Sequence, residues 1–304
     1  MPISILRKLP AIALAPLVLT VTLAGCGESD PPQRSVESLR LIGEKILTRR
    51  TEFAGTVVGG LSGIDYDEAN KRFLLISDDR TTTDSGNAPR FYTAALTFDA
   101  ASFGSIAFAS TVAMKQPDGS SYHKVPDPLV ADPESIRIDP ISGNYAWASE
   151  GDRSLAATPP RMIHPFIREV RPDGTHVREY TLPSMFQMKS TETGPRGNLA
   201  LEGITFTPDR NSLVAIMEGA LFDDAATPTV SAGSVSRITV FNRSTGLASA
   251  QFAYPIDKVQ ATPAPADQFT VNGPTEILAI TQDRFLVLER SFSVGVIGNQ
   301  VRLY

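Results

Sequence analysis

Short apolar runs separated by polar turns recur along the chain at a long and regular interval. Four of these runs can be aligned, at residues 61–67, 133–139, 201–207 and 275–281. Their second positions follow one another at a nearly constant interval of about 70 residues, a regularity that indicates a repeated structural unit. These second positions are occupied by Ser62, Glu134, Glu202 and Glu276.

A second apolar run follows each of the first ones and ends in a carboxylate. The spacing from the second position of the first run to the carboxylate that ends the second run is identical in the first three repeats. It is smaller in the last repeat, where the connecting turn is shorter. Polar turns such as residues 139–143 join the two runs, so each pair has the composition of a β-hairpin. The carboxylates that end the second runs are Asp78, Glu150, Glu218 and Glu289.

Further apolar runs follow the hairpins, for example at residues 91–98 and 105–114 in the first repeat. No segment shows the period of an amphipathic helix. Four antiparallel strands in a unit that recurs about every 70 residues predict an all-β, β-propeller-like fold of four-stranded blades. A β-sandwich or another β fold is the alternative, but a sandwich does not need this repeat.

The predicted blades bring the acidic positions together. The first strand of each propeller blade lines the central channel, and the ends of the neighbouring strands converge on one face. Carboxylates gathered there repel one another unless a cation, protons or backbone donors compensate them. The alternative is a structural ring of acids bonded to backbone N–H groups. We predict catalytic residues at Glu134, Glu202 and Glu276, and metal ligands at Asp78, Glu150, Glu218 and Glu289.

Calcium or another divalent cation is the ion that this set of ligands favours. Calcium binds six to eight hard oxygen atoms with tolerant geometry. The chain offers carboxylates and loop carbonyl groups, and it has three scattered histidines as nitrogen ligands. The sequence therefore predicts a divalent cation as the cofactor.

Arginines lie in or just after the segments that end the strands. A guanidinium group binds a phosphate or a carboxylate through two parallel hydrogen bonds. Each arginine could equally be the counter-ion of the nearest acid. The five arginines are Arg80, Arg90, Arg153, Arg196 and Arg290, of which we predict Arg80, Arg196 and Arg290 to bind the substrate.

The N-terminal segment, up to Cys26, has the pattern of an export signal. Arg7 and Lys8 precede an almost wholly apolar stretch at residues 9–23, and small residues then lead to the cysteine. This ending matches the bacterial lipoprotein box, in which the cysteine receives a diacylglyceryl thioether and becomes the new N-terminus. The alternatives are an uncleaved anchor helix and an ordinary signal peptide, but prolines break the apolar stretch and it is short for a membrane span.

The chain is accordingly divided into three parts. Residues 1–25 are the predicted lipoprotein signal peptide, residues 26–38 the lipidated Cys26 and a flexible tether, and residues 39–304 the propeller domain. Removal of the signal takes away two basic residues and no acidic ones, so the mature chain is more strongly negative than the whole sequence. We predict an exported lipoprotein of the cell envelope, on the outer membrane or facing the periplasm.

Composition excludes several other functions. The chain of 304 residues has one cysteine, which rules out a disulfide framework and leaves no zinc cluster. Its negative charge and the lack of a long basic run argue against a nucleic-acid partner. Residues 60–63 resemble a nucleophile elbow, but Ile64 stands where the pattern needs glycine, and the histidines have no motif-like placement, so a serine triad is unsupported.

An ordered set of short motifs resembles the phytase-like esterase family of bacterial secreted proteins. The resemblance covers the chain from about position 55 to the end, and it implies a propeller-like β domain with esterase-like or phytase-like hydrolysis. Members of that family usually continue into another acidic hairpin, whereas here Tyr304 falls in the expected third strand of the last blade. Either the sequence is incomplete or a strand at residues 39–47 closes that blade. The motifs include Gly60-Leu-Ser-Gly-Ile-Asp65, Ile76-Ser-Asp-Asp-Arg80, Gly197-Asn-Leu-Ala-Leu-Glu-Gly203 and Leu286-Val-Leu-Glu-Arg-Ser291.

The residues and the resemblance together lead to one preferred function. We expect an envelope-anchored hydrolase of phosphate or carboxylic esters, with a small-molecule substrate, a divalent cation, and contact with the membrane through Cys26. The alternative is a non-catalytic propeller that binds a ligand or a protein partner, because a fold does not fix a function.

Overall fold

The computed structural model describes residues 35–80, 88–122 and 130–304. Cys26, the predicted signal peptide and most of the predicted tether lie outside the described residues. Within these ranges no helix has the length and apolar character needed to span a bilayer.

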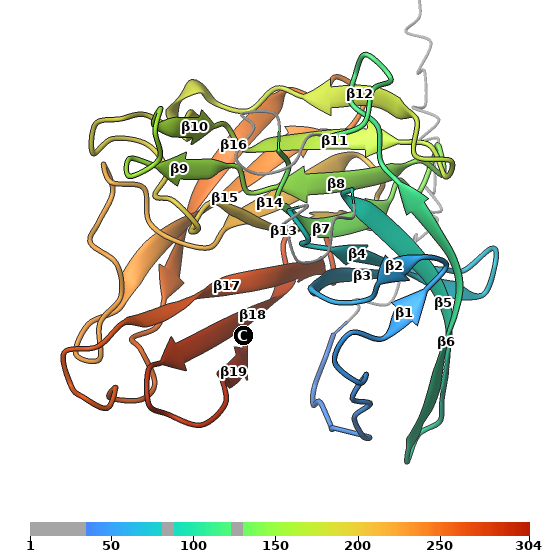
Figure 1. The fold of residues 1–304 in the computed structure, drawn as a ribbon, viewed down its shortest axis with the longest axis horizontal. Helices are drawn as coiled ribbons and strands as arrows, with labels where there is room; N and C mark the ends of the chain where they lie inside the picture. Colours follow the sequence, from blue (N-terminus) through green and yellow to red (C-terminus); the bar gives the residue numbers. More distant parts are fainter. Residues whose placement is uncertain (1–34, 81–87, 123–129) are drawn as a thin grey trace, which may run out of the picture. The chain divides into compact units, whose positions relative to one another are not determined.

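The described residues form a four-blade β-propeller, which confirms the predicted fold class (Figure 1). Three blades have four antiparallel strands and the fourth has three. Blade 1 contains β3 (Leu61–Asp67), β4 (Arg72–Ser77), β5 (Arg90–Phe98) and β6 (Phe103–Ala113). Blade 2 contains β7 (Pro133–Ile138), β8 (Tyr145–Ser149), β11 (Phe166–Val170) and β12 (His176–Tyr180). Blade 3 contains β13 (Leu201–Phe206), β14 (Ser212–Met217), β15 (Ser234–Asn242) and β16 (Ala248–Ile256), and blade 4 contains β17 (Thr270–Ala279), β18 (Phe285–Ser293) and β19 (Gln300–Leu303).

Three short elements lie outside the blade sheets in the described part of the chain. Two two-stranded ribbons pair β1 (Glu52–Phe53) with β2 (Thr56–Val57), and β9 (Asp152–Ser154) with β10 (Arg161–Ile163). One 3₁₀ helix, η1, spans Ser184–Phe186.

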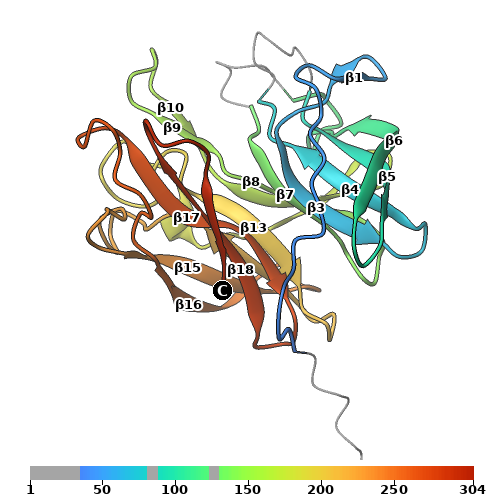
Figure 2. The same ribbon diagram turned by 90° about the horizontal axis from the view of Figure 1, so that it is seen from below.

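The first strands of the blades, β3, β7, β13 and β17, lie side by side in chain order (Figure 2). Two glycines allow the close approach of their backbones. A Cβ atom on Gly63 would lie 2.9 Å from Cα of Ser135, and one on Gly203 would lie 2.9 Å from Cα of Glu276. Glycine is therefore required where β3 meets β7 and where β13 meets β17.

Apolar side chains fill the spaces between consecutive blades. One cluster joins blades 1 and 2 around Ile76 and Trp147, and another joins blades 2 and 3 around Ile167 and Leu201. A smaller cluster around Ile277 joins blades 3 and 4. The alternating apolar positions of the repeats thus form the core, because each sheet buries at least one face against a neighbouring sheet.

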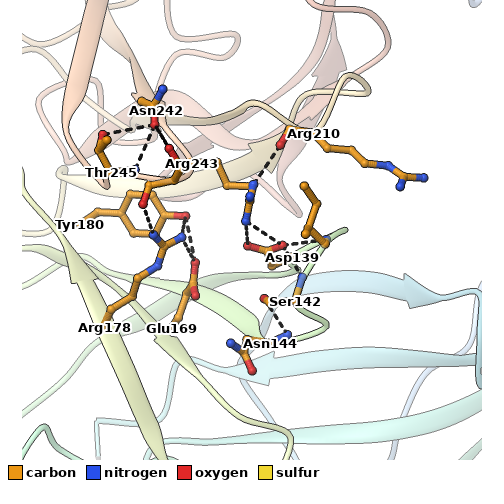
Figure 3. Close-up of polar contacts among 12 residues, drawn as sticks. Asp139, Ser142, Asn144, Glu169, Arg178, Tyr180, Arg210, Asn242, Arg243 and Thr245 are labelled. Atoms are coloured by element: carbon orange, nitrogen blue, oxygen red, sulfur yellow. Dashed lines mark hydrogen bonds and ion pairs between the residues drawn. The ribbon is translucent and has the colours of Figure 1, made fainter.

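A polar network reinforces the junction of blades 2 and 3 at the hairpin-turn end of the strands (Figure 3). Asp139, in the turn after β7, accepts hydrogen bonds from two backbone N–H groups of that turn and forms an ion pair of 3.0 Å with Arg243 of blade 3. Burial raises the pKa of Asp139, but these bonds outweigh it and hold the pKa below its usual value. Arg178 of β12 adds a hydrogen bond to the carbonyl oxygen of Ser244.

The suggestion that an N-terminal strand closes the last blade is wrong. Residues 39–47 contain no strand, and β19 pairs with β18. The segment lies instead against the β5–β6 hairpin, where Arg40 donates a hydrogen bond to the carbonyl oxygen of Ala100 and Gly43 packs beside Phe103. Its apolar side chains Leu41 and Ile46 are exposed, so they are not buried in a blade.

Candidate functional site

A β-bulge in the first strand of each blade positions one side chain per blade. The pairing skips one residue between Leu61 and Gly63, and it does the same at the equivalent place in the other three blades. A bulged residue is unpaired, and its side chain is aimed differently from its neighbours. The bulged residues are Ser62, Glu134, Glu202 and Thr275.

The alignment of the fourth repeat is therefore wrong by one residue. Thr275, and not Glu276, occupies the position equivalent to Glu202. Glu276 follows the bulge, at the position of Gly203 in blade 3. It still faces the same pocket, where its carboxylate forms an ion pair of 2.8 Å with Arg137.

A second position also contributes one side chain per blade; it lies directly after the second strand in blades 1 to 3 and inside β18 in blade 4. The backbone N–H groups of Asp78, Glu150 and Glu218 donate hydrogen bonds of 2.7, 2.9 and 2.7 Å. In each case the acceptor is the carbonyl oxygen of the residue directly before the first strand of the same blade. In blade 4 the residue in this position is Arg290, which pairs with Gly273. A cation thus replaces the carboxylate of the other three blades.

The predicted placement of Glu289 at a strand end is wrong for the same reason. It lies inside β18, one residue before the strand-end position, and its side chain is buried elsewhere. The carboxylate accepts hydrogen bonds from the Tyr254 hydroxyl at 2.9 Å and from the Asn272 amide at 2.7 Å. These donors compensate its charge, so Glu289 stabilises the junction of blades 3 and 4.

The two positions converge on one pocket of about 860 Å³, here called the acidic pocket. All four blades contribute to it. Glu218 is not among the lining residues, but its carboxylate lies close to those of Glu150 and Glu202, which are. The charged residues that line it are Asp78, Asp79, Asp132, Glu134, Glu150, Glu202 and Glu276, with Arg80, Arg90 and Arg290.

Two groups of carboxylates within this site are close enough to share a metal ion. Asp132, Glu134 and Glu150 form one group, and Glu150, Glu202 and Glu218 form the other. In each group, one oxygen atom per residue lies within 4.8 Å of the others. Glu150 belongs to both groups, so the two overlap. This all-oxygen set matches the ligands that calcium prefers.

The carboxylates of the acidic pocket repel one another unless a further charge compensates them. Burial and the charges of Asp132 and Glu150 raise the pKa of Glu134 to about 10. Burial also raises the pKa of Asp132 to about 6 and that of Glu218 to about 7, although Arg80 and Arg290 oppose the rise. Burial and neighbouring carboxylates place the pKa of Glu202 well above its usual value. The site therefore takes up protons or a cation at neutral pH.

Asp132 belongs to the site, although the repeat alignment did not select it. It is buried, and its carboxylate forms an ion pair of 2.8 Å with Arg80. The equivalent residues of the other blades are Gly60, Ala200 and Gly273, so no acidic column marks this position. Its place two residues before Glu134 in the chain was the available signal.

The arginines divide into two sets. Arg80 bridges Asp132 and the Asn198 side chain, Arg90 pairs with Asp79 at 3.0 Å, and Arg290 lies 3.6 Å from Glu218. All three line the acidic pocket. Arg153, by contrast, donates to the carbonyl oxygen of Lys189.

The predicted placement of Arg196 in the site is wrong. Its guanidinium group donates hydrogen bonds to the carbonyl oxygens of Ala220 and Ala225, at 3.1 and 2.7 Å, and stacks over Phe222. It does not line the acidic pocket. Backbone carbonyls and an aromatic ring satisfy this arginine, so it stabilises a loop.

Similar folds occur among solved structures, all at low identity. The β-propeller domain of Myceliophteria thermophila Cps50 (Swd1) is 13% identical, with 82% of this chain and 72% of the other covered and a TM-score of 0.33. The Dos1 propeller is 6% identical, with a TM-score of 0.33; the match covers 80% of this chain and 59% of the Dos1 chain. The periplasmic gluconolactonase PpgL of Pseudomonas aeruginosa is 12% identical, over 83% of this chain and 74% of the other, with a TM-score of 0.35. These likenesses carry no argument about activity.

The comparison by sequence is more specific. None of the curated proteins matches the chain in sequence. A sequence model of the phytase-like family, described as esterase-like activity of phytase, matches residues 56–304, which include all four blades and every residue of the acidic pocket. The chain therefore belongs to the phytase-like family.

Proposed function

We propose that the chain is a hydrolase of phosphate or carboxylic esters that works with a divalent cation in the acidic pocket. The observation that carries this proposal is the pair of overlapping carboxylate groups around Glu150, buried beside two arginines. Family membership supports hydrolysis of this general kind. A bound cation would polarise the ester oxygen and lower the pKa of a water molecule.

The side chains of the chain have separate tasks in this reaction. Asp132, Glu134 and Glu150, or the group that joins Glu150 to Glu202 and Glu218, would hold the cation. Arg80 lies next to Asp132 and Arg290 lies next to Glu218, and both would bind the anionic group of the ester.

A proton acceptor is also needed, because attack by water releases a proton. Glu202 is the candidate when Asp132, Glu134 and Glu150 hold the cation, since it is then not a ligand and the charges of Glu134, Glu150 and Glu218 raise its affinity for a proton. Glu276 is held by Arg137 and by its own backbone bond to Ile277, so it would position the neighbouring groups.

Exchange of Glu202 for glutamine is expected to lower kcat for ester hydrolysis about 100-fold, because the amide keeps the shape but neither accepts the proton nor holds the cation. The measurement is turnover of a panel of phosphate and acyl esters in calcium and in chelator. Glu52→Gln, an exposed change in β1, is the matched control and should leave turnover unchanged. Ligand binding without turnover in the wild-type protein would instead support the non-catalytic alternative.

Attachment to the cell envelope through Cys26 is a further part of the proposal, supported by the sequence before that cysteine. A Cys26→Ala protein is expected to leave the detergent-soluble membrane fraction, because it has no acceptor for the lipid. Fractionation of cells that produce each form measures this. If mass spectrometry of the wild-type N-terminus finds no diacylglyceryl adduct, the proposed lipid anchor is wrong.

A further inference from the structure

A second pocket, of about 620 Å³, adjoins the acidic pocket between blades 3 and 4. Asn198 and Arg290 line both pockets, and Glu218, which lies close to Glu150 and Glu202 of the acidic pocket, lines the second one. The remaining wall comes from the β14–β15 loop, the start of β17 and the second half of β18. A ligand that touches Arg290 can therefore extend from one pocket into the other.

The walls of this second pocket differ chemically from those of the acidic pocket. Phe269 is 64% exposed and Phe292 is 37% exposed, and their ring centroids lie 6.3 Å apart at 42°. Leu199, Val271 and Pro228 add apolar surface. Large apolar side chains exposed together beside a polar site are typical of a ligand-binding surface. We call this the aromatic pocket.

Charge argues against a polyanionic occupant. Arg290 is the cationic residue of the aromatic pocket, and it already lies 3.6 Å from the carboxylate of Glu218. The other polar residues that line it, such as Asn272 and Asn299, are neutral. A ligand with many phosphate groups would find one guanidinium group and one carboxylate here. A ring with a single anionic substituent fits both the apolar wall and Arg290.

We propose, on the basis of the hydrolase function above, that the aromatic pocket binds the aromatic group of an aryl ester whose reacting bond lies in the acidic pocket. Hydrolysis breaks the bond between the aryl-bearing oxygen and the phosphorus or acyl carbon. Water supplies the hydroxyl group to the acid and the proton to the departing aromatic alcohol, so no other co-reactant is needed. Phe269 and Phe292 determine specificity by contact with the ring.

Equilibrium binding of non-hydrolysable phosphonates tests this pocket apart from turnover. The wild-type protein, in calcium, should bind 2-naphthylmethylphosphonate at least about tenfold more tightly than methylphosphonate. Phe269→Ala should remove most of this preference and leave the affinity for methylphosphonate unchanged. Phe252→Ala, at a phenylalanine of β16 that is 59% exposed and lines neither pocket, is the matched control and should change neither affinity.

Any other binding result overturns the assignment. Equal affinities of the wild-type protein for the two phosphonates, or no binding of either, would show that the pocket does not select a ring. If Phe269→Ala weakens the binding of both phosphonates by the same factor, Phe269 has a structural role. If both Phe269→Ala and Phe292→Ala keep the preference for the naphthyl compound, the ring binds elsewhere. A preference for cyclohexylmethylphosphonate equal to that for the naphthyl compound would show an apolar but not an aromatic subsite. If the preference is found but 2-naphthyl phosphate and 2-naphthyl acetate are not hydrolysed, the proposed function fails and the binding pocket stands.

Discussion

An Arg137→Met protein is expected to unfold with a free energy about 3 kcal/mol below that of the wild type. Arg137 is buried, pairs with Glu276 at 2.8 Å, and donates to the carbonyl oxygens of Ile64 and Ile277 in blades 1 and 4. Methionine has a similar length but leaves the Glu276 charge without its counter-ion and removes the guanidinium donor from two carbonyl groups. Removing one partner of such a buried pair costs about 3–5 kcal/mol, and the partial exposure of Glu276 favours the lower end. Urea unfolding measures the difference.

The matched control is Arg302→Met, which breaks an exposed ion pair of 2.9 Å with Asp257. Exposed pairs contribute about 0–1 kcal/mol, so this variant should unfold close to the wild type. Glu276→Gln in the Arg137→Met background removes the uncompensated charge and should restore part of the loss. Equal stabilities of the Arg137→Met and Arg302→Met proteins would contradict the role of Arg137 as the link between blades.

In chelator, the free energy of unfolding is expected to fall as the pH rises from about 4 towards 7. Burial raises the pKa of Asp132 from 3.8 to about 6 and that of Glu218 from 4.5 to about 7. In this window the folded protein holds protons that the unfolded chain has already released, so unfolding releases protons and a higher pH favours it. Each extra proton contributes a slope of about 1.4 kcal/mol per pH unit. Thermal melting across this range measures the effect.

Calcium should remove this loss, because a cation replaces the protons among the carboxylates. At about 100 times its Kd, a ligand that binds only the folded state adds about 2.7 kcal/mol. The gain should be larger at pH 7 than at pH 5, since protons compete with the ion. Glu202→Gln should reduce the response, whereas Glu52→Gln should not. Identical melting of the wild-type protein in calcium and in chelator at pH 7 would mean that these acids form a structural network without a metal.

The long repeat in the sequence was enough to predict the propeller, because strand and turn patterns are local properties of the sequence. The bulged glutamates Glu134 and Glu202 were predicted to face each other, and the structure places both in the acidic pocket. Asp78 and Glu150 were predicted in the same way. The number of residues between the bulge and the strand end is the same in the first three repeats, so aligning one position also aligns the other.

The fourth blade could not be aligned from the sequence because a bulge leaves no mark in the apolar pattern. Moving the pairing by one residue turns every side chain to the other face of the strand. Glu276 and Glu289 are acidic and lie within one residue of the expected positions, so they displaced Thr275 and Arg290 in the alignment. The orientation of Arg196 depends on a carbonyl-rich loop that forms only in the folded chain.

Arg290 also removes the rotational equivalence of the four strand-end positions. With a carboxylate at this position in every blade, the four positions would present the same charge in four directions. Three carboxylates and one guanidinium group instead give the strand-end positions a positive side, next to blade 4 and the aromatic pocket. A ligand held by that side is fixed about the channel axis. Under the proposed hydrolase function, the pocket would then present one prochiral face of a substrate to attack, so that selectivity would come from charge as well as from shape.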